Sequence, residues 1–324
     1  MNIPASYQEL VKKEIELFCK HLKSSPHELY EPMRYMLTME GKKLRPILLL
    51  LSCKNFKGNL KQALPVALAI EVFHSFTLMH DDITDNAPLR RNKPSVHVKW
   101  NTNIALLSGD AMMVKAYEYL AKAPASCLGE ILNLFNETAL KVCEGQQLDM
   151  NFETQEKVSI KDYLHMISLK TAALFSASLE MGAILAGASK KDSDRMKVFG
   201  KNIGMLFQLQ DDVLDVFGHQ EKVGKQTGGD IIQNKKTFLL LKALELAKGK
   251  DLQELKSLLK KSGISPKEKV KRVTAIYQKV GILNHASKHM MDYYLKALKA
   301  IEPVESPEIK ILVNLVDGMM SREI

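Results

Sequence analysis

Apolar residues recur every three to four positions along most of the chain, the spacing of one buried face of an α-helix. The predicted helices cover residues 6–23, 29–39, 47–51 with its flanks, 62–85, 102–122, 128–150, 160–188, 192–217 and 237 to the end. No convincing alternation of apolar and polar residues indicates strands, and only 17 glycines and 11 prolines interrupt the 324 residues. We predict an all-α protein. No shift in composition and no repeat marks a boundary, so we expect one domain over residues 1–324.

Several short signals predict where these helices begin and end. Ser159-x-x-Asp162 is typical of a capping box that opens the helix over 160–188. Gly41 suits the C-terminus of the helix before it. The basic, glycine-rich stretch 218–236 is predicted to be irregular, as is the polar loop 86–95.

The composition, 46% hydrophobic and 26% charged, is typical of soluble globular proteins. The four cysteines are scattered, which favours reduced thiols, and the N-terminus has no signal-peptide cleavage site. The longest membrane-like run, 172–188, contains Glu180 and many small residues, which favours a packed internal helix. We expect a cytoplasmic protein without stable membrane insertion.

The net charge of +9 is concentrated in one region, because residues 248–280 carry 10 Lys/Arg against 3 Asp/Glu. The simplest interpretation is a solvated helical face. Attraction to an anionic membrane surface or to nucleic acid is the alternative. With a single Trp and no interleaving of basic and aromatic residues, we expect no nucleic-acid partner.

The most informative stretch is Asp81-Asp82-x-x-Asp85, which ends an apolar helix. Asp81 and Asp85 are one turn apart on one helix face. At about 5 Å and an effective dielectric constant of about 20, such a pair repels by about 3 kcal/mol. Oxygen ligands of this kind suit a hard cation such as Mg²⁺, which shares its coordination sphere with substrate phosphates. A frayed acidic helix end is the alternative interpretation.

A second copy of the pattern, Asp211-Asp212-x-x-Asp215, follows another apolar helical run. Two alike motifs favour two halves of one metal site over two frayed helix ends. Basic residues lie near both motifs, in three clusters. These are Lys42 and Arg45, then Arg90 and Arg91, then Lys170, Lys225, Lys235 and Lys236 in the second half of the chain. Any single one could be an ion-pair partner, but together they fit the binding of two diphosphate groups.

With these motifs in order, the sequence resembles the trans-isoprenyl diphosphate synthases, the polyprenyl synthetase family. The matching residues are Gly41-Lys42-x-x-Arg45, Glu71-x-x-His74, Asp81-Asp82-x-x-Asp85, Arg90-Arg91, Ser108-Gly109-Asp110, Lys170-Thr171, Phe207-Gln208-x-x-Asp211-Asp212-x-x-Asp215, Gly224-Lys225 and Asp230–Lys235. They cover roughly residues 40–240. Asn92 departs from the family pattern, which usually has Gly after the Arg pair.

The resemblance implies a single helical bundle of the isoprenoid synthase type with a central catalytic cavity, and commonly a homodimer. It implies a prenyltransferase that condenses isopentenyl diphosphate head-to-tail with an allylic diphosphate. The allylic C–O bond ionises, the double bond of isopentenyl diphosphate attacks the cation, and a proton is lost. The resemblance implies three Mg²⁺ ions held by both Asp-rich motifs.

Residue roles follow from the same resemblance. Asp81, Asp85 and Asp211 would bind Mg²⁺ directly, with Asp82, Asp212 and Asp215 in support. The catalytic residues would be Asp81, Asp85, Asp211, Lys170 and Lys225. The allylic diphosphate would contact Arg90, Lys170, Thr171, Gln208, Lys225 and Lys235. Isopentenyl diphosphate would contact Lys42, Arg45, His74 and Arg91. A satisfied core histidine is the alternative for His74.

Product length would be set by Phe76 and Thr77, five and four residues before Asp81. In the family the growing chain descends beside this helix, and bulk on it stops growth. Phe76 therefore predicts a product of fifteen or twenty carbons, although an ordinary core phenylalanine is the alternative. Two rival functions share parts of this pattern. One is a class I terpene cyclase, and the other is a non-catalytic partner subunit of a prenyl diphosphate synthase.

Overall fold

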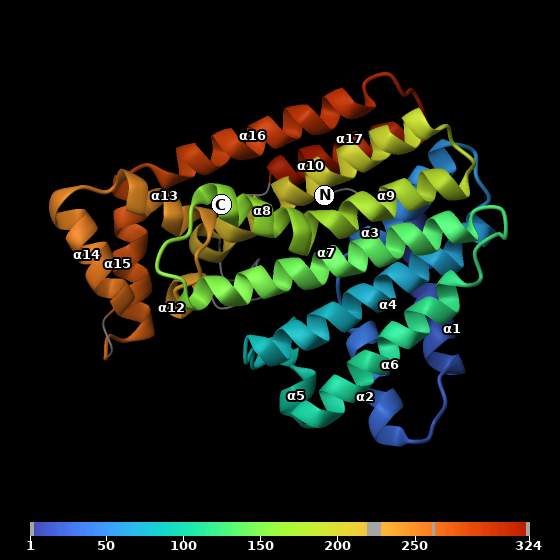
Figure 1. Ribbon diagram of the computed structural model, residues 1–324, viewed down its shortest axis with the longest axis horizontal. Helices are drawn as coiled ribbons and strands as arrows, with labels where there is room; N and C mark the ends of the chain where they lie inside the picture. The colour runs from blue at the N-terminus through green and yellow to red at the C-terminus, as the bar shows by residue number, and fades with distance from the viewer. Residues whose placement is uncertain (1–2, 219–227, 261–262, 322–324) are drawn as a thin grey trace. The chain divides into compact units, whose positions relative to one another are not determined.

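In the computed structural model, nearly every residue outside short connections is helical, as the apolar spacing predicts (Figure 1). The structure describes residues 3–218, 228–260 and 263–321. The chain divides into two compact units. Unit 1 comprises Met1–Thr138, Leu174–Gly200 and Ala300–Leu315, and unit 2 comprises Ala139–Ala173, Lys201–Lys299 and Val316–Ile324. That residues 1–324 act as one domain stays a prediction.

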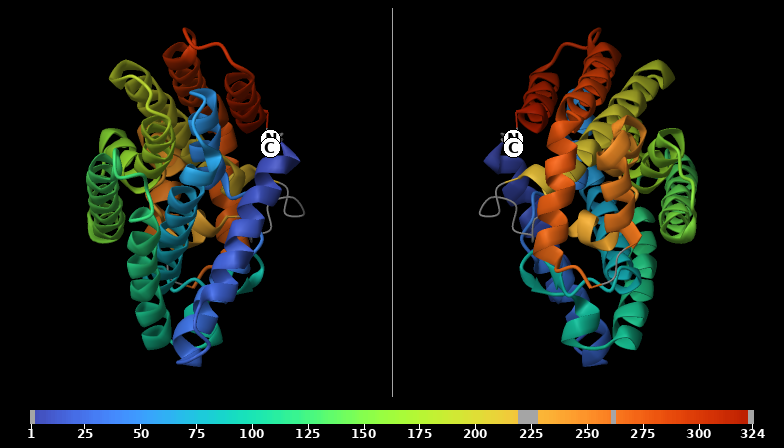
Figure 2. Two further views of the ribbon diagram at one scale, coloured as in Figure 1. Left: turned by 90° about the vertical axis from the view of Figure 1, so that its right-hand side faces the viewer. Right: turned by 90° about the vertical axis from the view of Figure 1, so that its left-hand side faces the viewer.

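Unit 1 is built around one long helix, α4. Its elements are α1 (Ala5–His21), α2 (His27–Thr38), α3 (Leu44–Asn55), α4 (Leu60–Thr84), β1 (Leu89–Arg90), β2 (Lys93–Pro94), α5 (Val96–Lys99), α6 (Thr102–Leu120), α9 (Ala173–Leu185), and parts of α7 (Leu128–Thr154), α10 (Lys190–Phe217) and α17 (Pro307–Met320). Helix α4 packs against α3 and α6, and α1, the dark blue helix of Figure 2, lies against α2, α3 and α4. An almost continuous apolar sequence, as in α3 and α4, forms the buried centre of such a unit.

Small residues let the helices of unit 1 approach closely. A Cβ atom added at Gly182 of α9 would lie 2.2 Å from the backbone oxygen of Leu49 in α3. Nearby, the buried hydroxyl of Ser52 donates a hydrogen bond of 2.6 Å to the backbone oxygen of Leu179. Ser108 and Gly109 act similarly on α6. The Ser108 hydroxyl donates to the oxygen of Leu29 at the start of α2, and Gly109 leaves room for the His80 ring of α4.

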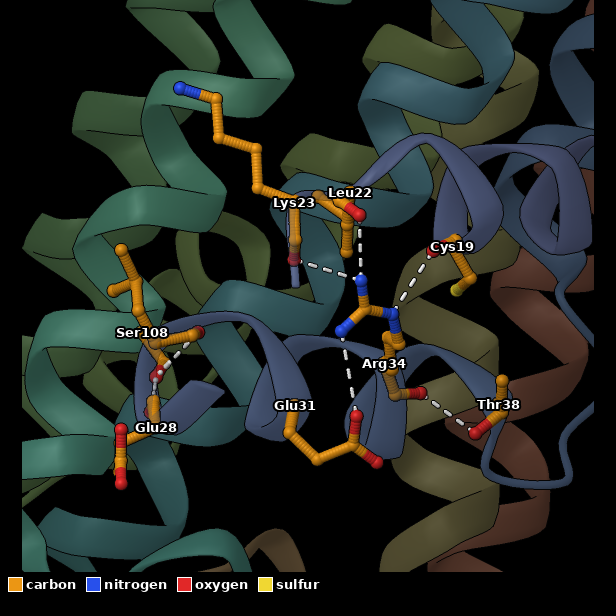
Figure 3. A network of polar contacts seen from close by, with 9 residues as sticks. Cys19, Leu22, Lys23, Glu28, Glu31, Arg34, Thr38 and Ser108 are labelled. Carbon is orange, nitrogen blue, oxygen red and sulfur yellow. Dashed lines mark hydrogen bonds and ion pairs between the residues drawn. The ribbon is translucent and has the colours of Figure 1, made fainter. Parts of the chain in front are cut away.

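The turn between α1 and α2 is held by one arginine (Figure 3). The guanidinium of Arg34 in α2 donates hydrogen bonds of 3.0, 2.7 and 2.9 Å to the backbone oxygens of Cys19, Leu22 and Lys23. Cys19 lies in the last turn of α1, and Leu22 and Lys23 directly follow the helix, where it offers carbonyl groups no donor. Arg34 therefore fixes the end of α1 against α2.

Unit 2 contains the second acidic motif and the other predicted site residues that do not belong to unit 1. Its elements are α8 (Ile160–Ile167), the π-helix η1 (Ser168–Ala172), α12 (Gly229–Gln233), α13 (Phe238–Leu246), α14 (Gly249–Lys260), α15 (Pro266–Lys279), α16 (Ile282–Ile301) and the remaining parts of α7, α10 and α17. The predicted capping box opens α8, since Ser159 and Asp162 each accept a hydrogen bond from the other's backbone N–H. Helices α14 and α15 pack together (Figure 1), and the outward lysines of α14, Lys250, Lys256 and Lys260, are exposed.

Four local features differ from the sequence-based expectation. The stretch 218–236, predicted to be irregular, contains the short helix α12 at Gly229–Gln233. The predicted helix over 160–188 is interrupted by the π-helix η1, and the predicted loop 86–95 contains the two-stranded hairpin β1–β2. Gly41 does not end α2, which stops at Thr38. Instead, a Cβ atom at Gly41 would lie 2.3 Å from a guanidinium nitrogen of Arg91, so this glycine makes room for that side chain.

Helix α4 is long and apolar enough to cross a membrane, and 61% of its apolar 18-residue window is buried inside the protein. Core helices commonly pass the same test, so this helix by itself is weak evidence for a span.

We predict that Gly182→Ala lowers the free energy of unfolding by about 2 kcal/mol, because the added methyl group overlaps the α3 backbone. Gly129→Ala is the matched control. No atom lies within 4 Å of a Cβ atom at Gly129 in α7, so this change should be neutral or stabilise by up to about 1 kcal/mol. Urea denaturation of both variants measures the difference. Equal stability of the two would contradict the close approach of α9 and α3.

Candidate active site

The predicted site residues fall into two groups, one in each unit. Unit 1 holds Lys42, Arg45, His74, Phe76, Thr77, Asp81, Asp82, Asp85, Arg90 and Arg91. Unit 2 holds Lys170, Thr171, Gln208, Asp211, Asp212, Asp215 and Lys235. Lys225, predicted to bind the allylic diphosphate, lies outside the described residues. That the two acidic motifs meet in one cavity stays a prediction.

The first acidic motif closes α4, and its middle carboxylate differs from the other two. Asp82 is 1% exposed and accepts hydrogen bonds from Nε and Nη2 of Arg90 at 2.9 and 2.5 Å. Asp81 and Asp85, on the adjacent helix face, are only partly buried. Burial lowers the pKa of Arg90, but the hydrogen bond to Asp82 and the charges of all three carboxylates raise it above its ordinary value overall. The guanidinium therefore stays charged.

A tight hairpin returns Arg90 to the end of α4. Strands β1 and β2 pair Leu89 with Pro94 and Arg90 with Lys93, so Arg91 and Asn92 form a two-residue turn. Both turn residues have positive φ, 52° and 61°, as two-residue hairpins require. Asparagine tolerates this left-handed conformation better than most residues. This explains how Asn92 can stand where the resembling family usually has Gly.

The turn also directs Arg91 toward the start of α3. Its guanidinium lies over Gly41 and donates a hydrogen bond of 3.2 Å to the backbone oxygen of Met39. Nearby, Lys43 forms a 2.8 Å ion pair with Glu71 of α4, whose side chain is 2% exposed. Lys43 and Glu71 were not among the predicted binding residues. Their pairing joins the α2–α3 connection to α4 at the point where the predicted isopentenyl-diphosphate residues gather.

Arg45 and His74 form a second contact between the α3 and α4 helices. Nη1 of Arg45 lies 2.9 Å from Nε2 of His74, and because guanidinium only donates, the imidazole accepts. Burial, followed by the charges of Arg45 and Arg91, lowers the pKa of His74 well below its usual value, so the ring is neutral. Burial also lowers the pKa of Arg45 to about 10. His74 therefore orients Arg45, which stacks 4.5 Å from the centre of the Phe175 ring.

The buried Nε of Arg45 has no hydrogen-bond partner within the described chain. A buried guanidinium N–H without an acceptor is unfavourable, and an anion would satisfy it. Partly exposed Arg91, the exposed Lys42 and the paired Lys43 lie on the same α2–α3–hairpin region of unit 1. We refer to Lys42, Lys43, Arg45 and Arg91 as the cationic cluster of unit 1. That it binds a diphosphate stays a prediction.

The two predicted chain-length residues lie on α4 with different surroundings. The ring of Phe76 lies between the rings of Phe73 and His80, at centroid distances of 5.7 and 4.6 Å, and remains partly exposed. Behind it, Phe73 contacts the buried Phe135 at 5.0 Å. The hydroxyl of Thr77 donates to the backbone oxygen of His74. Phe76 is therefore not a fully buried core residue but the outer member of an aromatic layer.

In unit 2 the second acidic motif likewise has a buried middle carboxylate and two partly buried outer carboxylates. Asp212, buried at 3% exposure, accepts hydrogen bonds from the hydroxyl of Tyr163 and, at 3.0 Å, from the amide nitrogen of Gln208. The hydroxyl of Thr171 donates to the Gln208 oxygen at 2.9 Å. Burial and the charge of Asp230 raise the pKa of Asp212 well above its ordinary range, and these two hydrogen bonds oppose the shift.

Lys170 and Thr171 are presented by the π-helix η1, a widened turn of a kind often found at functional sites. Gly145 of α7 allows this turn to approach, because a Cβ atom there would lie 2.3 Å from the backbone nitrogen of Lys170. The Lys170 ammonium forms a 2.6 Å ion pair with Asp149, also from α7.

The outer aspartates of the second motif lie beside the short helix α12. Asp215 accepts a 3.0 Å hydrogen bond from the backbone N–H of Asp230 at the start of this helix. Asp211 is partly buried, as are Asp230 and Lys235. Asp215 thus has a structural role at the α12 N-terminus in addition to its predicted support of a metal ion.

These carboxylates fit a divalent ion that is completed by other oxygen ligands. Within the described residues, no group of three or more His, Cys, Asp or Glu side chains could hold a metal alone. Asp81 and Asp85 offer oxygen-only ligands one turn apart. Mg²⁺ and similar hard ions are typically bound by one or two carboxylates together with substrate phosphates and waters. The donor set therefore suits an ion delivered with a diphosphate.

Four side chains with polar contacts at or beside the predicted site residues were not predicted from the sequence: Lys43, Glu71, Asp149 and Tyr163. Glu71 stands in one of the matching motifs, so its place in the motif was a usable signal. Tyr163 precedes Lys170 by seven residues and lies in an ordinary amphipathic pattern, which gives no indication of its polar partner.

The chain is similar to known proteins over most of its length. The model of the polyprenyl synthetase family matches residues 26–280. The chain is 36% identical over 302 residues to the geranylgeranyl diphosphate synthase of Methanosarcina mazei, covering 92% of this chain and 91% of that protein.

Two solved structures are similar over almost the whole chain. A geranylgeranyl pyrophosphate synthase superposes with a TM-score of 0.93 at 39% identity, covering 100% of both chains. The polyprenyl synthase of Caulobacter crescentus CB15, complexed with calcium and isoprenyl diphosphate, superposes with a TM-score of 0.90 at 26% identity, covering 99% of this chain and 96% of that one. The all-α isoprenoid synthase fold predicted from the sequence is thus confirmed, and a divalent metal is characteristic of this family's catalysis. The chain belongs to the polyprenyl synthetase family, the trans-isoprenyl diphosphate synthases.

Proposed function

We propose that this protein is a short-chain trans-prenyltransferase that condenses isopentenyl diphosphate with an allylic diphosphate. The product would be a prenyl diphosphate of fifteen to twenty carbons, with pyrophosphate released. The observation that carries the proposal is the cationic cluster around Arg45 in unit 1, which contacts His74 and Glu71 of α4, the helix that ends at the carboxylates of Asp81 and Asp85. The cluster suits the diphosphate of one substrate, and the carboxylates suit the metal-bound diphosphate of the other.

The residues of the chain would act by binding and orientation. Lys42, Arg45 and Arg91 would hold isopentenyl diphosphate, with His74 keeping Arg45 in place. Arg90, Lys170, Thr171, Gln208, Lys225 and Lys235 would hold the allylic diphosphate. No nucleophilic side chain is needed, because the allylic C–O bond breaks heterolytically and its electron pair leaves on pyrophosphate. The isopentenyl double bond then forms the new C–C bond, and loss of a proton, which the departed pyrophosphate can accept, restores a double bond.

The cofactor we propose is Mg²⁺, with three ions in the complete site. Asp81, Asp85 and Asp211 would hold them, with Asp215 in support. When bound, the ions would offset the negative charge that develops on the departing pyrophosphate. Asp82 would contribute indirectly, because its carboxylate is already occupied by Arg90.

We also propose a cytoplasmic homodimer. Helix α6 of unit 1 exposes a row of large side chains, including Leu107 at 61%, Val114 at 67% and Tyr117 at 36%. These positions are seven and three residues apart and share one helix face. An apolar row of this kind is typical of an interface, and family members commonly pair.

We predict that the purified protein, given isopentenyl diphosphate, dimethylallyl, geranyl or farnesyl diphosphate and Mg²⁺, forms a C15–C20 prenyl diphosphate detectable by mass spectrometry. Removal of divalent ions with EDTA should abolish turnover, and added Mg²⁺ should restore it. A hydrocarbon formed from farnesyl diphosphate alone would instead indicate a terpene cyclase. No turnover with any primer would indicate a non-catalytic partner subunit.

We predict that Asp81→Asn mainly lowers activity, whereas Asp82→Asn mainly lowers stability. Asp81→Asn should leave the thermal midpoint within about 2 °C but lower kcat at saturating Mg²⁺ by about 100-fold or more, because a metal ligand is lost. Asp82→Asn should destabilise the metal-free protein by about 3 kcal/mol, because Arg90 is left buried without its counter-charge. Calorimetry without metal and a Mg²⁺ titration of activity separate the two. Equal destabilisation by both variants would refute the assignment.

We predict that Phe76→Ala lengthens the product by one or more five-carbon units, because it removes the outer ring of the aromatic layer. Phe56→Ala is the matched control, a partly exposed phenylalanine that precedes the opposite end of α4. Mass spectrometry of the products should show a shift for the first variant only. An unchanged distribution for Phe76→Ala would mean that Phe76 does not limit the chain.

A further inference from the structure

Four side chains of unit 2 form one directed chain of hydrogen bonds, and they come from three elements. Thr171 of η1 donates to Gln208 of α10, Gln208 donates to Asp212 one turn further along α10, and Tyr163 of α8 donates to the other oxygen of Asp212. Every bond in this chain points toward Asp212. The aspartate is therefore the common acceptor that sets the direction of the network.

The direction of the network decides how the amide of Gln208 is oriented. An amide presents two donors on nitrogen and an acceptor on oxygen, and either end could face Thr171. Asp212 accepts from the amide nitrogen at 3.0 Å, so the amide oxygen is left to face Thr171, which donates to it at 2.9 Å. The hydroxyl proton of Thr171 is consequently donated to Gln208, and the lone pairs of the Thr171 oxygen remain for other partners.

Tyr163 is the element that fixes Asp212 itself. Its side chain is 3% exposed, and it follows directly after the Ser159–Asp162 capping box that anchors the start of α8. A phenylalanine would fill nearly the same volume without placing a hydroxyl in a buried environment. Burial of that hydroxyl is favourable only because Asp212 accepts its hydrogen bond, which in turn holds one carboxylate oxygen in place.

We propose that Tyr163 is a positioning residue for the allylic-diphosphate side of the reaction. Acting through Asp212, it holds Gln208 and Thr171 in one orientation, so that these two groups, which we propose to contact the allylic diphosphate, keep a fixed polarity. The inference rests on the proposed prenyltransferase function. It assigns Tyr163 no contact with substrate or metal.

The test is the kinetic analysis of Tyr163→Phe at saturating Mg²⁺ and a temperature well below unfolding. We expect kcat to fall about tenfold, which is the order of loss for a buried hydrogen bond. The KM for isopentenyl diphosphate should stay within about twofold, because the residues proposed to bind it, Lys42, Arg45 and Arg91, belong to unit 1.

Tyr294→Phe is the matched control. Tyr294 also donates a hydrogen bond to an aspartate of unit 2, Asp317, at 2.7 Å, and that pair lies outside the proposed site. Removal of this hydroxyl should leave kcat and KM unchanged. An equal loss of kcat in both variants would show a general effect of removing a tyrosine hydroxyl and would overturn the inference.

A double-mutant cycle with Asp212→Asn tests the route of the effect. If Tyr163 acts through Asp212, Tyr163→Phe should change kcat by less than about twofold in the Asp212→Asn background. The same tenfold loss in both backgrounds, or wild-type kcat for Tyr163→Phe alone, would overturn the inference and leave the proposed function intact. An inactive wild-type protein would instead overturn the proposed function.

Discussion

The ion pair between Asp82 and Arg90 is the interaction on which the local architecture of unit 1 depends. Helix α4 is buried along most of its length, so the acidic residue that points inward at its end must be neutralised. Removal of an isolated carboxylate from water is very unfavourable, and a bidentate guanidinium with good geometry offsets most of that cost. Arg90 of the hairpin β1–β2 supplies this guanidinium, and the hairpin reverses direction through Arg91 and Asn92, which both adopt the left-handed conformation. The same turn places Arg91 beside Gly41. The hairpin that neutralises Asp82 therefore also positions one member of the cationic cluster.

Unit 2 also buries the middle carboxylate of its acidic motif, but different side chains donate hydrogen bonds to it. Asp212 occupies the second position of its motif, as Asp82 does, and it is also buried with its oxygens occupied. The helix period explains the correspondence. The first and fifth residues of Asp-Asp-x-x-Asp share one face, whereas the second is rotated by about 100°. When the first and fifth residues face a cavity, the second must face the interior. The motif therefore combines two outward carboxylates with one inward carboxylate that orients its neighbours, Arg90 in one unit and Gln208 in the other.

The sequence was sufficient to predict the helices and the chemistry, because both depend on short-range patterns. The three-to-four spacing in α1, α4 and α6 predicts their bounds to within about two residues, and the capping box at Ser159 is observed as predicted. The features that the sequence did not reveal depend on contacts between distant residues. Gly41 has a typical helix-end context, but its reason is the approach of Arg91, fifty residues later. Lys43 and Glu71, or Tyr163 and Asp212, become partners only when their helices pack. The π-helix η1 likewise lacks a local signal, since its residues continue the apolar spacing of α8.

The contacts of the cationic cluster of unit 1 orient its arginines without neutralising them, which suits the binding of an anion. Arg45 is held by His74, whose low pKa keeps the imidazole neutral, so that contact orients the guanidinium without neutralising it. Arg91 donates to a backbone carbonyl, which likewise carries no net charge. Glu71 is a buried acid whose charge acts on both Arg45 and Arg91, and it already pairs with Lys43. Burial lowers the pKa values of both Arg45 and Arg91, and repulsion by a neighbouring arginine adds to each shift, whereas the charge of Glu71 opposes it. The folded protein therefore bears a free-energy penalty for keeping them charged. A bound diphosphate would offset that penalty, so the penalty would contribute to the affinity for the isopentenyl diphosphate that we propose to bind there.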